Sequence, residues 1–500
     1  MSLTEKMSGT EEGNLKVTVA RTIKWNVIDR VSSQVLYAVT GIVLARMLSQ
    51  EDFGLVTAIL VFQAFASLFV DSGFSSALIQ RKSPTKLDYS TVLWFNLGMS
   101  VVLYVILFFA SPWIADIFGG DRRLIPLARV MFISFILNAS AIVQTNMLMK
   151  RMEVRMVAVS NSLGLIAGSV IGIYMAVSGW GAWAIVWQTI VIAAVKSLVL
   201  WLTGGWRPMR AFSLESLKSC FAVGSGVMVT SFLNTAFQNI SGFFIGLKVG
   251  LVPLGYYGQA DKWSKMGVMS LSQVLTASFL PLLSKVQDEP ERYARMCCKT
   301  HRFTAYLLFP AMGLLIVMAR PIFHTLFGTK WDPSIFLFQI LLVQGVFTVL
   351  MLLYRNFILG LGKAKLLVVT EVVRDVTAVA AIVAVLPYIG LETPDSPVEG
   401  LRFLLFGQVI ASALTWGVSL AYVIKLTGRG VMAYLLDLAP YFFQTALIAI
   451  PCVIIGHLDY HPLLLCVMQG CVFAVLYMGI NFLMGSKIQR DALAYFRGRL

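Results

Sequence analysis

Residues 53–80 form a nearly uninterrupted apolar run that is followed by two cations, Arg81 and Lys82. A run of this length can cross a bilayer as one helix, because about 20 residues span the hydrocarbon core. Asp71 lies inside the run, and a carboxylate at mid-depth costs roughly 2.5–3.5 kcal/mol on insertion scales. Such a charge normally faces a cavity or a partner, so Asp71 is a candidate for coupling-ion binding or gating. The alternative is a structural role, in which Asp71 bonds to backbone and locks the helix.

The composition extends this interpretation to the whole chain. Its 500 residues are 58% hydrophobic and 13% charged, whereas soluble domains average about 45–50% apolar and about 25% charged residues. We therefore expect an integral membrane protein. The net charge of +15 is explained by the accumulation of Lys and Arg in cytoplasmic loops, so no nucleic acid is expected as a partner. The six cysteines have no CxxC spacing and are interpreted as reduced packing residues.

The apolar runs predict an all-α membrane protein with about fourteen spans. We place them at 23–46, 53–80, 89–111, 124–148, 156–178, 181–203, 215–246, 255–284, 296–318, 335–359, 366–387, 401–424, 434–456 and 462–485. With a cytoplasmic N-terminus, 26 of the 40 Lys and Arg residues fall on the cytoplasmic side, 7 on the opposite side and 7 within spans. This asymmetry favours an even number of spans with both termini in the cytoplasm.

An internal repeat divides these spans. PWIADIFG at 112–119 matches PIFHTLFG at 321–328, Asn146 matches Asn356, and Phe53-Gly54 matches Leu254-Gly255. The offsets of 209, 210 and 201 residues predict that the first six helices are repeated, in the same orientation, as the next six. The expected domains are a cytoplasmic tail (1–20), an N-lobe (21–205), a C-lobe (213–426), two additional helices (434–486) and a second cytoplasmic tail (487–500).

Charged side chains within the spans are the candidate site. We expect Arg30, Lys196, Lys262 and Arg374 to line a cavity that suits an anionic ligand such as a diphosphate, and Asp71 and Asp375 to take part in ion coupling or gating. Structural alternatives stay open: Asp29, Arg30 and Lys265 reach the interface, Asp261 pairs with Lys265, Arg355 anchors a helix end, and Glu371, Arg374 and Asp375 form an ion-pair cluster.

Signatures of catalysis do not occur in the sequence. GxxxxGK[ST], HExxH and DxD are absent, so neither an ATP-driven step nor a metal-dependent transferase is predicted, and we expect no cofactor or metal. The GWGAW sequence at 179–183 is typical of a tight turn between helices. We therefore expect a transporter rather than an enzyme.

A set of short motifs resembles the polysaccharide-exporter branch of the multidrug/oligosaccharidyl-lipid/polysaccharide flippase superfamily, in particular the colanic-acid and succinoglycan exporters. They are LSQEDFG (48–54), DSGFSSALIQRK (71–82), GWGAWA (179–184), WRP (206–208), LGYYGQA (254–260), PLLSKVQDE (281–289) and FGTKWDP (327–333). The resemblance implies two six-helix lobes plus two helices. It also implies ATP-independent alternating access that moves an undecaprenyl-diphosphate-linked oligosaccharide across a bacterial inner membrane. Membrane lipids, a polysaccharide polymerase and a co-polymerase are the other candidate partners.

Two other functions stay open at this point. An ion-coupled multidrug exporter of the same superfamily would have a cavity dominated by acids and aromatics, whereas the charges embedded here are mainly basic. A membrane glycosyltransferase, polymerase or ligase would usually carry a large loop with acidic or His residues, and the loops between the predicted spans are short.

Overall fold

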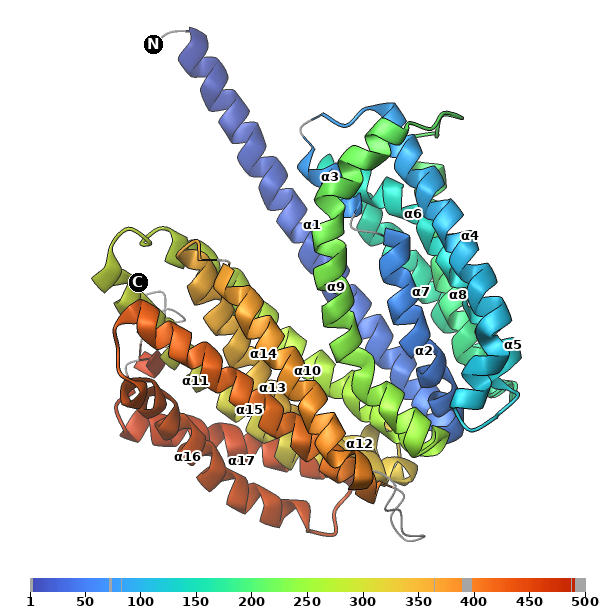
Figure 1. Ribbon diagram of the computed structural model, residues 1–500. Coiled ribbons are helices and arrows are strands. Elements are labelled where there is room, and N and C mark those ends of the chain that lie inside the picture. Colours follow the sequence, from blue (N-terminus) through green and yellow to red (C-terminus); the bar gives the residue numbers. More distant parts are fainter. Residues whose placement is uncertain are drawn as a thin grey trace. The chain divides into compact units, whose positions relative to one another are not determined.

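The computed structural model describes residues 3–71, 74–81, 83–363, 365–388, 398–486 and 488–490. Side chains are not described at 3–21, 23, 71, 75–76, 222–223, 227, 274, 276–278, 280–281 and 365. Every regular element within the described ranges is a helix (Figure 1). The predicted all-α fold class is thus confirmed. The chain divides after Gly255 into two compact units, each of which is described by itself.

Unit 1 is a helical bundle in which α7 packs between α1 and α8, and α6 packs against both α4 and α8 (Figure 1). Its helices are α1 (Leu3–Met47), α2 (Gln50–Asp71), α3 (Phe74–Gln80), α4 (Lys86–Ile117), α5 (Leu124–Met131), α6 (Ile133–Lys150), α7 (Val154–Val177), α8 (Trp183–Thr203) and α9 (Leu214–Lys248). The first helix of the predicted C-lobe, α9, packs against α2 and α3, and the lobe boundary at 205–213 stays a prediction.

Unit 2 begins within α10 (Leu251–Ser284). In this unit α15 contacts α13 and α14, α11 contacts α13 and α16, and α17 contacts α16 and α12. The elements after α10 are α11 (Pro290–Val317), α12 (Ala319–Leu326), η1 (Thr329–Trp331), α13 (Asp332–Gly360), α14 (Lys365–Val385), η2 (Leu386–Tyr388), α15 (Glu399–Thr427), α16 (Val431–Gly456) and α17 (Pro462–Leu483).

A helix occupies each of the fourteen predicted ranges, but fewer qualify as membrane spans. Among the described residues eleven helices are long and apolar enough, or twelve if α9, which bends by 46°, is counted as one span. The helix α14 carries three charges near its middle, at Glu371, Arg374 and Asp375. Fourteen crossings are not confirmed and stay a prediction.

The helix predicted over 53–80 is described in two parts, and residues 72 and 73 between them lie outside the described residues, so a continuous helix stays a prediction. The helix α2 ends at Asp71, and a second helix, α3, runs from Phe74 to Gln80.

The corner between α1 and α2 is fixed by a capping box. The backbone N–H of Asp52 donates to Ser49 Oγ (3.1 Å), and the backbone N–H of Ser49 donates to Asp52 Oδ2 (3.0 Å), which satisfies N–H groups that would otherwise lack a partner. The other carboxylate oxygen of Asp52 accepts a hydrogen bond from the backbone N–H of Ala182 (2.9 Å), in the turn between α7 and α8. Gly181 adopts φ +55° in this turn. The LSQEDFG and GWGAWA motifs are therefore in direct contact, and this contact attaches the corner between α1 and α2 to the turn between α7 and α8. The tight turn predicted at 179–183 is confirmed.

The first turns of α2 and α10 cross at two glycines. A methyl group on Gly54 would overlap the carbonyl oxygen of Leu251, and one on Gly255 would overlap the carbonyl oxygen of Gln50. Both glycines and both carbonyl residues are separated by 201 residues, the offset of the repeat in this region. The contact is therefore reciprocal between equivalent positions of the two repeats, as in a twofold-related interface.

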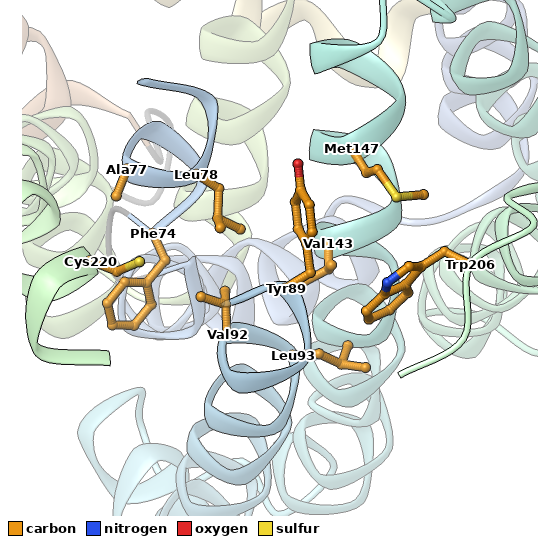
Figure 2. Packing of buried hydrophobic residues seen from close by; sticks show 10 residues of the cluster. All are labelled: Phe74, Ala77, Leu78, Tyr89, Val92, Leu93, Val143, Met147, Trp206 and Cys220. Atoms are coloured by element: carbon orange, nitrogen blue, oxygen red, sulfur yellow. The ribbon is translucent and has the colours of Figure 1, made fainter. Parts of the chain in front are cut away.

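A hydrophobic cluster holds the start of α9 to α3, α4 and α6 (Figure 2). Tyr89 and Trp206 meet edge to face, with their ring centroids 6.4 Å apart. The residues of the cluster are Phe74, Ala77, Leu78, Tyr89, Val92, Leu93, Val143, Met147, Trp206 and Cys220. Beside them the buried Asp88 accepts hydrogen bonds from the Thr85 backbone and from Ser216 of α9, and pairs with Arg81 at 3.0 Å. Apolar packing and a satisfied carboxylate thus fix α9 at the same end.

We predict that Gly54→Ala and Gly255→Ala each destabilise the protein. The added methyl group must push α2 and α10 apart, and overpacking of this kind typically costs about 1–3 kcal/mol. Thermal unfolding of the purified protein in detergent should show a lower Tm for each variant. Gly98→Ala is the matched control, since no atom lies within 4 Å of a methyl group there. Equal Tm values for all three variants would contradict the crossing.

Candidate functional site

Polar side chains connect α1 to α7 along most of their contact. The Asn161 amide donates to both carboxylate oxygens of Asp29, at 3.3 and 3.2 Å. Further along, Ser32 and Ser162 lie 3.4 Å apart through their hydroxyl oxygens. Thr40 donates to Ser169 at 2.6 Å, in a buried position. Polar side chains of α1 thus take part in its contact with α7.

Lys196 lies on the face of α8 that packs against α7. A methyl group on Gly164 of α7 would lie 3.4 Å from Lys196 Cβ and 2.8 Å from the carbonyl oxygen of Ile192, so the two helices approach closely here. The Lys196 side chain is half-buried, and the acidic group whose charge acts on it is Asp29. Asp29, Asn161 and Lys196 come from α1, α7 and α8, and we call these three residues the Lys196 cluster.

Sequence reasoning missed the position of Asp29 in this cluster. No acid lies close to Lys196 on its own helix, and the counter-charge comes from α1, well over a hundred residues earlier. The sequence suggested that Asp29 reaches the interface and gave no signal of the helix that it faces.

Arg30 is not on the face of α1 that contacts α7. Its side chain is exposed, as are those of Asn26, Gln34 and Tyr37. Their spacing places these four residues on one side of the helix. Arg30 thus lies next to Asp29 in sequence but on a different face, and its role in binding substrate stays a prediction.

Lys262 lies in unit 2, on α10, and is exposed. Its Nζ is 5.7 Å from the centroid of the Trp263 indole. The predicted pairing of Asp261 with Lys265 is confirmed, with 2.7 Å between Lys265 Nζ and Asp261 Oδ2. Substrate binding by Lys262 also stays a prediction.

Arg374 makes ion pairs with both acids of its own helix. Its Nη1 lies 2.6 Å from Glu371 Oε2, and its Nη2 lies 2.9 Å from Asp375 Oδ1. Arg355 of α13 approaches the same Glu371 at 3.7 Å. Asp375 is buried. The ion-pair cluster considered from the sequence is therefore present, and substrate binding by Arg374 stays a prediction.

Asp71 lies at the end of α2, and its side chain falls outside the described residues. A further buried carboxylate, Asp437 of α16, was not singled out from the sequence. It pairs with Arg302 of α11 and lies 3.6 Å from Arg429, in the turn before α16. Arg302 precedes Asp437 by 135 residues, and no spacing pattern indicates this pairing. Over the described part of the chain, no group of three or more His, Cys, Asp or Glu residues could hold a metal ion.

Long apolar helices and charges paired between or within them define a multi-span membrane protein with the architecture of a transporter. The chain belongs to the family described as "Polysaccharide biosynthesis protein", whose model matches residues 43–336.

Three relatives carry names from cell-surface polymer synthesis. The lipopolysaccharide biosynthesis protein WzxC of Escherichia coli (strain K12) is 27% identical over 325 residues, which are 65% of this chain and 66% of WzxC. The succinoglycan biosynthesis transport protein ExoT of Rhizobium meliloti (strain 1021) is 26% identical over 367 residues, 73% of this chain and 74% of ExoT. The teichuronic acid biosynthesis protein TuaB of Bacillus subtilis (strain 168) is 24% identical over 348 residues, 69% of this chain and 71% of TuaB.

Solved structures share the fold. The lipid II flippase MurJ in an inward closed conformation aligns with a TM-score of 0.70 and 14% identity, over 94% of this chain and 100% of MurJ. An inward-facing multidrug resistance transporter of the MATE family, in the MOP superfamily, aligns with a TM-score of 0.60 and 18% identity, over 81% of this chain and 99% of the transporter. At these identities the likeness concerns the fold alone.

We predict that Arg374→Gln destabilises the protein by about 1–3 kcal/mol, because it leaves a buried Asp375 without its cation. The double variant Arg374→Gln/Asp375→Asn should recover most of this loss, as measured by thermal unfolding in detergent. Arg355→Gln, whose contact with Glu371 is longer and exposed, is the control and should change Tm little. If the double variant is no more stable than Arg374→Gln, the ion pair does not stabilise the fold.

Proposed function

We propose that the protein is a flippase that moves undecaprenyl-diphosphate-linked oligosaccharide units of an exopolysaccharide across a bacterial inner membrane. Three observations support this function: membership of the polysaccharide biosynthesis family, the fold shared with a lipid II flippase, and basic groups inside membrane helices. The Lys196 cluster is the main support. An ammonium group within a membrane span costs free energy, and an anionic substrate bound to it would offset that cost.

The chemistry of the Lys196 cluster suits a diphosphate. Asp29 is held by the Asn161 amide and acts on Lys196 electrostatically. A diphosphate carries more negative charge than one carboxylate, so it would compete with Asp29 for the ammonium group. Arg30, Lys262 and Arg374 would add attraction for the diphosphate or for acidic sugars. Asp71 or Asp375 would bind a coupling cation.

The movement we propose is alternating access by two like-oriented six-helix lobes, with the lipid tail left in the bilayer. Both termini would lie in the cytoplasm, as the distribution of Lys and Arg favours. A polysaccharide polymerase and its co-polymerase would receive the translocated unit. No bond of the substrate changes in this process, so the protein would act without a cofactor.

We predict that Lys196→Ala reduces polymer export several-fold in a strain that lacks the native gene, because the cavity loses its internal cation. Lys265→Ala is the matched control, since Lys265 is exposed and pairs with Asp261 on its own helix. Exported polysaccharide and accumulated lipid-linked oligosaccharide are measured in the same cells, with membrane levels of each variant equalised by blotting. Normal export by Lys196→Ala would remove Lys196 from the site.

Purified protein in proteoliposomes separates the proposed function from the alternatives. Radiolabelled lipid-linked oligosaccharide should move between leaflets without change in its bonds. Formation of a new glycosidic bond would indicate an enzyme. Export of cationic drugs by an overexpressing strain, with no movement of the lipid-linked sugar, would indicate a multidrug exporter.

A further inference from the structure

The first half of α11 carries its positive charge on one side. Arg292, Arg295, Lys299 and Arg302 are spaced by three, four and three residues, so they share one face of the helix over roughly 15 Å. All four side chains are exposed. The opposite face is buried through Tyr293, Cys297, Thr300 and Thr304. The predicted span begins at residue 296, which left Arg292 and Arg295 in the preceding loop, whereas α11 begins at Pro290. An ordered helix therefore presents them together.

Nearby acids neutralise the cations at the beginning of this face. Arg292 lies 3.0 Å from Glu289, and Arg295 lies 3.4 Å from Glu291. These pairs are exposed, and pairs of this kind contribute roughly 0–1 kcal/mol. They balance the charge of this end, which therefore has little attraction for an anion.

The other end of the face keeps an excess of positive charge. Lys299 and Arg302 lie at this end. A third cation, Arg429, lies near them, because its guanidinium contacts Cys298 of α11. The one acid paired with these groups in the described contacts is Asp437, whose side chain is 4% exposed, whereas those of Arg302 and Arg429 are 54% and 37% exposed. Asp437 holds the two arginines in place from the buried side and leaves parts of both guanidinium groups accessible. Three cations and one carboxylate give this group a net charge of +2.

We propose that Lys299, Arg302 and Arg429 bind the phosphate of an anionic phospholipid headgroup. The helix α11 continues to Val317 as a candidate membrane span, so cations in its first half reach the headgroup region with their long side chains. Guanidinium groups bind phosphate oxygens through paired hydrogen bonds. A basic residue near an anionic membrane surface contributes about 1 kcal/mol to binding. The site lies entirely within unit 2 and does not depend on the proposed transport function.

The test measures lipid retention by the purified full-length protein. The protein is reconstituted in bilayers of phosphatidylcholine and phosphatidylglycerol, extracted mildly, and its bound phosphatidylglycerol is counted by native mass spectrometry. Lys299→Gln should weaken retention about fivefold, the equivalent of about 1 kcal/mol, and Lys299→Gln/Arg429→Gln should weaken it further. Arg295→Gln, at the neutral end of the same face, is the matched control and should retain as much lipid as the unmodified chain.

Three results would overturn the proposal. Equal retention by Lys299→Gln and Arg295→Gln would show that the position of the charge is irrelevant. Displacement of phosphatidylglycerol by a trace of polyprenyl diphosphate would assign the site to the transported lipid. Unchanged lipid retention combined with the loss of a co-purifying acidic protein would make the face a protein interface. Arg302→Gln is combined with Asp437→Asn, because Asp437 would otherwise stay buried after losing one of its two arginine partners. If this double variant does not fold, the lipid retention of Lys299→Gln still tests the proposal.

Discussion

The close backbone crossing of α2 and α10 is the constraint on which the architecture depends. Gly54 and Gly255 leave room for the carbonyl groups of Leu251 and Gln50, and no residue with a side chain could do so. Small residues permit such approaches in membranes, where apolar surface alone gives helices little reason to associate. The two glycines occupy equivalent positions of the predicted repeat, so the same requirement for a residue without a side chain recurs in both helices. The boundary between the two compact units follows Gly255 immediately, so α10 leaves the crossing and continues as part of unit 2.

Polar groups supply the second organising interaction. In the hydrocarbon region an unsatisfied polar group costs several kcal/mol, so the helices that carry such groups must meet partners. Asp52 bonds both to its own corner and to the turn before α8. Asn161 bonds Asp29, and Ser169 bonds Thr40. These contacts attach α1, α2, α7 and α8 to one another at defined registers, which the packing of leucine and valine side chains would specify less strictly.

Much of the fold could be predicted from the sequence because length and apolarity alone locate membrane helices. A helix occupies every predicted range, and the turn at Gly179 and Gly181 has the positive φ angles that its composition indicated. Pairings within one helix, such as Asp261 with Lys265, follow from spacing. Pairings between helices, such as Asp29 with Asn161 or Asp437 with Arg302, depend on packing that no periodicity encodes.

The two kinds of pairing have different consequences for a moving protein. Arg374 carries its acids, Glu371 and Asp375, on its own helix, so its charge stays compensated wherever α14 moves. Lys196 depends on Asp29 of a different helix. Because the attraction between unlike charges falls with their separation, a displacement of α1 relative to α8 would change this interaction. An anion bound at Lys196 would replace it. The charge of Lys196, like that of Arg302 with its partner Asp437, is thus compensated across two helices and depends on their relative position.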